Sequence, residues 1–208
     1  GRVQQWVGDS VRLGVTGNTE RVDEKRTKAV GADILVRRSQ TTYVDAEVAR
    51  SSGTNSSLAR STDGGLTLTE KEGTGGKSAL GWRVGGQLDM ADIRPFGIDT
   101  GKIGGYYEKK QAGFSTTSDR LSANRRVWGA HAAMPITGTM DAGVTLDDLK
   151  DGEGQRRRDS KFAASWQSMP QLKATVGVTH TRLHSPTAIA AGKYGYDGNR
   201  ADVGVRLD

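Results

Sequence analysis

Several residue types are scarce in this sequence, and each scarcity excludes a class of protein. Cysteine is absent, which excludes a disulfide framework and any thiolate metal site. Apolar residues make up only 34% of the chain and aromatic residues 6%, so a densely packed soluble core is hard to build. No stretch approaches the ~18 consecutive apolar residues of a membrane-spanning helix.

Short segments of alternating apolar and polar residues recur along the whole chain. The clearest, residues 78–90, has apolar side chains such as Trp82 at even positions and polar ones such as Arg83 at odd positions. A period of two places the two sets on opposite faces of a β-strand. Charge on an inward face does not suit a dry core. It suits a chain that curls into a barrel with lipid outside and water inside.

The alternation predicts about eleven strands. They lie near residues 10–17, 28–37, 41–50, 62–70, 78–90, 99–110, 123–134, 138–147, 159–168, 171–182 and 199–207. Helix is not expected, because glycine is abundant, with 29 residues, and capped amphipathic stretches are lacking.

The predicted connections fall into two sizes. Short turns are expected at 38–40, 134–137 and 168–171, the last two with a proline. Long loops rich in Gly, Ser, Asp and Asn are expected at 17–27, 51–61, 111–122, 148–158 and 183–198. Short turns at one end and long loops at the other are typical of an up-and-down membrane barrel.

The predicted fold class is therefore all-β: an antiparallel up-and-down sheet that forms an outer-membrane-type β-barrel or a fragment of a larger one. Residues 1–208 are interpreted as a single domain of about 10–12 strands. Because single-chain bacterial barrels usually have an even number of strands, an odd count predicts that this chain does not close alone. The missing strands would be further sequence of the same chain, another subunit, or a strand that the alternation does not reveal.

The net charge of +6 raises nucleic acid as a partner, but 30 basic and 24 acidic residues are interleaved along the chain. The densest basic run, Arg156–Arg158, directly follows an acidic stretch and is interpreted as part of a solvated loop. We expect membrane lipid and lipopolysaccharide as partners, and no nucleic acid.

The candidate chemical motifs are weak. His180 and His184 would face one metal on a helix, but on a strand a four-residue step spans about 13 Å. The glycine-rich run 73–78 lacks the first glycine of a phosphate loop, and 147–153 fails the calcium-loop spacing. His131 has no Ser or Asp at a useful spacing. We expect no catalytic, cofactor or metal site, and no enzyme.

Charged residues on the polar parity of the strands form the more informative set. They admit two interpretations: a pore lining that selects solutes by charge, or cross-strand ion pairs on a solvated face, which we favour. These candidate lumen-facing residues are Asp33, Asp45, Glu47, Arg83, Asp89, Glu108, Asp141, Lys161, Lys173, Asp202 and Arg206.

Four local runs carry a family resemblance. They are Arg94–Gly97, Ile103–Lys110, Gln111–Ser115 and Val127–Thr137. With them, the chain over 10–207 resembles the β-barrel region of large, repeat-containing proteobacterial outer-membrane surface proteins. The resemblance implies a barrel anchored in the outer membrane and no particular activity. The low aromatic content would leave the aromatic girdles of such a barrel thin.

Two functional hypotheses follow. The first is a non-enzymatic outer-membrane β-barrel, or a large piece of one, acting as a channel or a membrane anchor. The second is a soluble extracellular β-sheet module for adhesion or structural assembly, which would explain the low hydrophobicity.

Overall fold

The computed structural model describes residues 1–22, 25–53, 58–60, 69–71, 78–94, 97–115, 121, 123–169, 171–185 and 196–207. The strands there are β1 (Arg2–Val7), β2 (Val11–Val22), β3 (Lys25–Arg37), β4 (Tyr43–Gly53), β5 (Leu58–Arg60), β6 (Thr69–Lys71), β7 (Ala79–Asp89), β8 (Lys102–Lys110), β9 (Arg125–Thr137), β10 (Met140–Asp151), β11 (Arg156–Met169), β12 (Leu172–His184) and β13 (Tyr196–Leu207). A short helix, α1 (Met90–Ile93), follows β7.

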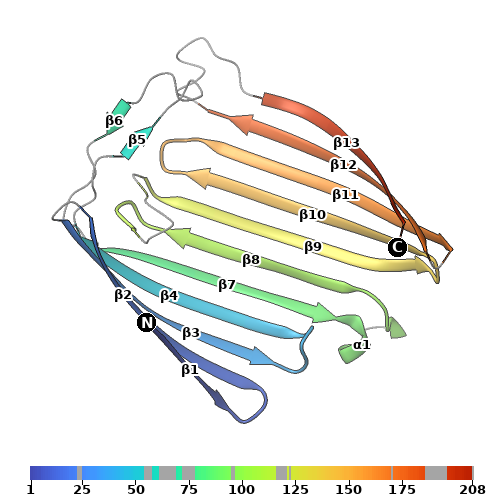
Figure 1. Ribbon diagram of the computed structural model, residues 1–208, viewed down its shortest axis with the longest axis horizontal. Coiled ribbons are helices and arrows are strands. Elements are labelled where there is room, and N and C mark those ends of the chain that lie inside the picture. Colours follow the sequence, from blue (N-terminus) through green and yellow to red (C-terminus); the bar gives the residue numbers. More distant parts are fainter. Residues whose placement is uncertain are drawn as a thin grey trace. The chain divides into compact units, whose positions relative to one another are not determined.

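Eleven strands form one sheet in the order β1-β2-β3-β4-β7-β8-β9-β10-β11-β12-β13, which Figure 1 shows from blue to red. β5 and β6 pair separately in a two-stranded sheet. Strands that follow one another in the chain are neighbours in the large sheet, and the hairpins β1–β2, β2–β3, β10–β11, β11–β12 and β12–β13 are antiparallel. The predicted fold class, an all-β antiparallel up-and-down sheet, is confirmed. Among the described residues, no helix is long and apolar enough to cross a membrane.

Ten of the eleven predicted segments coincide with strands of the large sheet. The eleventh, 62–70, lies outside the described residues except for its end in β6. β1 was not predicted, because its short sequence interrupts the alternation: Gln5 shares a parity with Val3, and Trp6 shares one with Arg2. In the strand order β1 and β13 stand at the two ends, and β2 pairs with β1 and β3 rather than with β13.

Two predicted long loops are wrong. β10 continues to Asp151 and β11 begins at Arg156, so only 152–155 connect them in place of 148–158. β2 and β3 likewise run through most of 17–27, as far as Val22 and from Lys25. In both hairpins the strands extend past their apolar part, where polar residues still complete the backbone ladder. The other three predicted loops lie partly outside the described residues.

The turn predicted at 134–137 is also displaced. These residues complete β9, and the chain reverses at Gly138 and Thr139. Proline cannot donate a hydrogen bond to a neighbouring strand. Pro135 nevertheless lies within β9, two residues before its end.

The sheet divides into two compact units. The first comprises residues 1–36, 45–84 and 108–126, and the second comprises 37–44, 85–107 and 127–208. Each is described by itself below.

Many large apolar side chains are exposed in each unit. In the first unit, Val15 lies opposite Val3 and is 64% exposed. In the second, Phe162 lies between Val144 and Val178 and is 52% exposed. Ala79 and Phe114 are the only buried hydrophobic residues among those that the structure describes. The described sheet therefore has no conventional apolar core.

Candidate functional site

The candidate charged residues of the first unit lie on the polar parity of their strands, and several pair across the sheet. Asp33 on β3 binds Arg2 on β1 at 2.9 Å, and its side chain is only 11% exposed. Arg83 approaches Asp45 at 3.6 Å. Glu108 is 3.1 Å from Lys110 and 3.5 Å from Arg125, whereas Glu47 is exposed.

In the second unit the candidates form rows set by the strand register. Asp89 lies 3.8 Å from Lys102, and Asp141 accepts a hydrogen bond from Ser165 at 3.4 Å. Asp202 pairs with Arg200 at 2.7 Å. The three remaining candidates occupy one face by register: Lys161 lies opposite Thr145 and Thr179, and Lys173 lies opposite Arg206. Whether this face lines a lumen remains a prediction.

Glycines of the middle strand let polar side chains meet two strands apart. Tyr106 on β8 donates to the Asp147 carboxylate on β10 at 2.8 Å. The contact passes over Gly129 on β9, where an added Cβ would lie 2.5 Å from the Tyr106 ring and from Asp147 Oδ1. We call this arrangement a glycine bridge.

The same arrangement recurs at two further places. His131 on β9 lies 3.4 Å from the Gln87 amide oxygen on β7, and a Cβ on Gly104 of β8 would be 2.5 Å from its ring. In the first unit, Asp33 lies over Gly14 to reach Arg2. The sequence did not predict this partner of His131. The available signal was a glycine on the polar parity of a middle strand.

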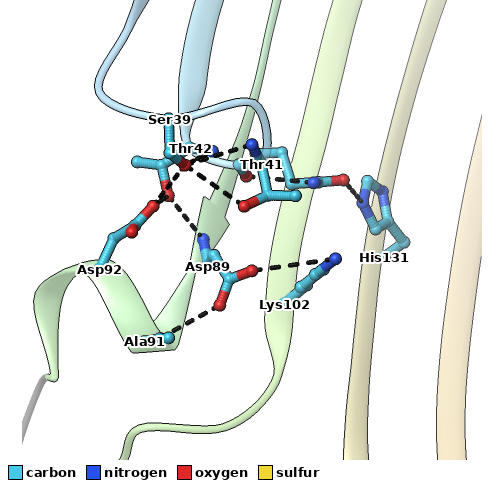
Figure 2. Close-up of polar contacts among 9 residues, drawn as sticks. Ser39, Thr41, Thr42, Asp89, Ala91, Asp92, Lys102 and His131 are labelled. Carbon is cyan, nitrogen blue, oxygen red and sulfur yellow. Dashed lines mark hydrogen bonds and ion pairs between the residues drawn. The ribbon is translucent and has the colours of Figure 1, made fainter.

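A polar cluster joins the β3–β4 turn to helix α1 (Figure 2). Asp92 on α1 accepts hydrogen bonds from Ser39 Oγ at 2.6 Å and from Thr42 Oγ1. Ser39 Oγ in turn accepts from the backbone N–H of Thr42 at 3.0 Å, and Thr42 Oγ1 accepts from the N–H of Asp89 at 3.0 Å. Asp89 caps the helix by accepting from the Ala91 N–H at 3.1 Å. We call Ser39, Thr42, Asp89 and Asp92 the turn clasp.

Gln87 extends the turn clasp toward the sheet. Its amide nitrogen donates to the Thr41 carbonyl at 3.1 Å, and its amide oxygen lies 3.4 Å from His131 Nε2. The β3–β4 turn, β7 and β9 are thereby joined through side chains. No nucleophile and base meet in this cluster at the geometry that catalysis requires, so its chemistry is that of a structural network.

The turn clasp predicts a pH dependence. Hydrogen bonds from Ser39 and then Thr42 lower the pKa of Asp92 below its ordinary 3.8; desolvation opposes this, and the charge of Arg38 adds to it. A lowered folded-state pKa means that the ionised carboxylate stabilises the folded chain fully above 3.8 and loses this effect as the pH falls through the folded value.

We therefore expect the denaturation midpoints of the natural chain and Asp92→Asn to converge as the pH falls below about 4. Urea titrations at a series of pH values test this, and Ser39→Ala should reduce the difference between the two chains. Two curves that stay parallel down to about pH 2 would contradict it.

The structure gives no support for a phosphate, calcium or metal site at the motifs considered in the sequence. Residues 73–77 of the glycine-rich run lie outside the described part of the chain. Residues 147–151 belong to β10, and Asp151 Oδ1 accepts from the N–H groups of Glu153 at 3.0 Å and Gln155 at 2.8 Å, which stabilises the turn. His180 Nδ1 faces Asn199 Oδ1 at 2.9 Å. Among the described residues, no three His, Asp or Glu side chains form a possible metal site.

The described strands define a class of protein: an antiparallel up-and-down sheet with exposed apolar side chains on one face and charged ones on the other. No protein-family model matches the chain, and no curated protein matches it. Among solved structures it is similar to "Outer-membrane expressed OmpT of Vibrio cholerae", at 11% identity and a TM-score of 0.49. The match covers 96% of this chain but 64% of that one, and it is a likeness of fold alone.

Proposed function

We propose that this chain is a non-enzymatic β-barrel, or a segment of one, in a bacterial outer membrane, where it acts as a channel or a membrane anchor. One observation carries the proposal: many large apolar side chains are exposed, while several carboxylates on the opposite face are partly enclosed. Phe162 is 52% exposed, whereas the side chains of Asp33 and Glu108 are 11% and 19% exposed.

A sheet of this kind is stable in lipid for two reasons. Exposed apolar surface is unfavourable in water and loses that cost when acyl chains cover it. The backbone groups of a strand must all be paired inside a bilayer, which an up-and-down sheet achieves when it is part of a closed barrel. The ion pairs and glycine bridges then face a polar interior, where they satisfy one another or water.

A soluble module is less well supported. It would require a second layer of structure over the apolar face, and in each unit many large apolar side chains are exposed.

The four tryptophans provide a direct test. Trp82, Trp128 and Trp166 belong to the apolar parity of β7, β9 and β11. Trp6 lies opposite Arg12 on the polar face, with the guanidinium 5.9 Å from its ring centre. In single-tryptophan variants refolded into vesicles, lipids with brominated acyl chains should strongly quench each of the first three. They should quench Trp6 weakly, because bromine quenches only at short range.

Trp6 is the internal control, since it lies on the polar face but has the same residue exposure, 37%, as Trp128. Equal quenching of Trp6 and Trp82, which share a unit, would sink the membrane assignment. A chain that stays monodisperse in water without detergent would favour the soluble module instead. Ion conductance across planar bilayers distinguishes a channel from an anchor.

A further inference from the structure

The apolar face of β10–β12 becomes basic toward the turn at 152–155. The register places Val144, Phe162 and Val178 in one row across the three strands. Two rows further on lie Asp148, Arg158 and Arg182, and the next row holds Lys150, Arg156 and His184. Four residues of strand separate Phe162 from Arg158, a distance of about 13 Å. Basic side chains therefore lie beyond apolar ones on a single face, with the mixed row of Leu146, Ser160 and His180 between them.

One buried carboxylate orients two of these cations. The Asp148 side chain is 3% exposed and its Oδ2 accepts from Arg156 Nη2 at 2.5 Å and from Arg158 Nε at 2.8 Å. A guanidinium has five N–H donors, so both arginines keep donors for a further acceptor. Asp148 thus holds the two arginines in fixed positions without consuming their capacity to bind an anion.

The basic side chains surround a cavity of about 480 Å³, lined by Lys150, Gly154, Arg156, Arg158, Arg182 and His184. Asp197 approaches Arg182 at 3.6 Å and offsets part of its charge. Lys150, Arg156, Arg158 and Arg182 supply four positive charges against two negative ones from Asp148 and Asp197, a balance of +2 with histidine neutral. The cavity is large enough for a phosphate group and carries the opposite charge.

We propose that this cavity binds the phosphorylated headgroup of a membrane amphiphile, whose acyl chains lie along Val144, Phe162 and Val178. The inference rests on the proposed function, because it assigns the row of Val144, Phe162 and Val178 to lipid. Arginine recognises phosphate through paired, charge-assisted hydrogen bonds, and lysine adds a point charge. The apolar row of Val144, Phe162 and Val178 on the same face favours an amphiphile. Nucleic acid would contact the basic side chains through its phosphates but would leave this apolar surface uncovered.

The experiment uses the full chain in phosphatidylcholine vesicles with lipid A as the phosphorylated probe. Dephosphorylated lipid A and inorganic phosphate serve as the two comparison probes. The test variant is Lys150→Gln/Arg182→Gln, which spares Asp148 and the two arginines that it holds. The matched control is Lys28→Gln/Lys109→Gln, which removes the same charge from exposed residues outside the cavity.

We expect the test variant to bind lipid A about tenfold more weakly than the natural chain, and the control to bind it unchanged. Dephosphorylated lipid A should bind the natural chain and the test variant alike. Equal lipid A affinity for the test variant and the natural chain would overturn the proposal. So would inorganic phosphate that binds as tightly as lipid A, because the acyl chains would then contribute nothing.

Tryptophan quenching in the same vesicles separates this inference from the proposed function. Normal quenching with unchanged lipid A binding defeats only the headgroup site. Loss of the face-dependent quenching pattern defeats the membrane assignment and the headgroup site with it.

Discussion

Replacing Phe162 by arginine should cost about 2–4 kcal/mol of folding free energy in a bilayer. Phe162 lies near the middle of β11, between Val144 and Val178 on the apolar face. A charged group there would have to lose its hydration or distort the bilayer around it, and the cost is largest near the midplane. Denaturant titration of the chain in vesicles measures the loss.

Ser165→Arg is the matched control on the same strand. Ser165 lies on the polar face opposite Asp141, to which its hydroxyl donates at 3.4 Å, so an arginine there gains a carboxylate partner. We expect a change within about 0.5 kcal/mol, as for an ordinary surface substitution. If the two arginines cost the same, or Ser165→Arg costs more, the assignment of the faces is wrong.

Gly129→Ala should destabilise the folded chain by about 1–3 kcal/mol, the usual cost of forcing a methyl group into a filled space. The new Cβ would lie 2.5 Å from the Tyr106 ring and from Asp147 Oδ1. Both side chains must move, and the 2.8 Å hydrogen bond between them is lost. Denaturant midpoints in the same vesicles report the change.

Two further variants separate a lost bridge from a general effect of the methyl group. Gly138→Ala adds a Cβ with nothing within 4 Å and should cost little. In a Tyr106→Ala background the obstruction is mostly removed, so Gly129→Ala should then cost much less, which a double-mutant cycle measures. Additive effects of the two substitutions would show that Gly129 does not act through Tyr106.

Much of the fold could be predicted because the strand signal is local. In β7 each apolar residue is two positions from the next, so Trp82 and Arg83 fall on opposite faces without knowledge of any neighbouring strand. β1 escaped prediction because Trp6 lies on the polar face, where Arg12 stacks against it. The loop expected at 148–158 was wrong because composition indicates solvation, whereas Asp148 pairs with Arg156 across the hairpin.

The candidate site was harder to predict from the sequence than the fold. The polar parity of Asp33 and Glu108 could be predicted, since it follows from the same period of two. Their partners could not, because Arg2 lies two strands from Asp33 and the pair requires the register of three strands. The basic cavity could not be predicted for the same reason. It depends on Arg182, which lies beside Arg158 only because β11 and β12 pair in this register.

The glycine bridges help to fix the register in which neighbouring strands pair. A slip of one residue exchanges the two faces of a strand and is strongly disfavoured, but a slip of two keeps every apolar residue outward. The alternating pattern therefore does not distinguish the native alignment from one shifted by two residues. If β9 slipped by two relative to β8, Val127 or His131 would replace Gly129 beneath Tyr106, and the ring would have no room. Small residues at these positions therefore disfavour a slip of two residues, which the alternating pattern alone does not prevent.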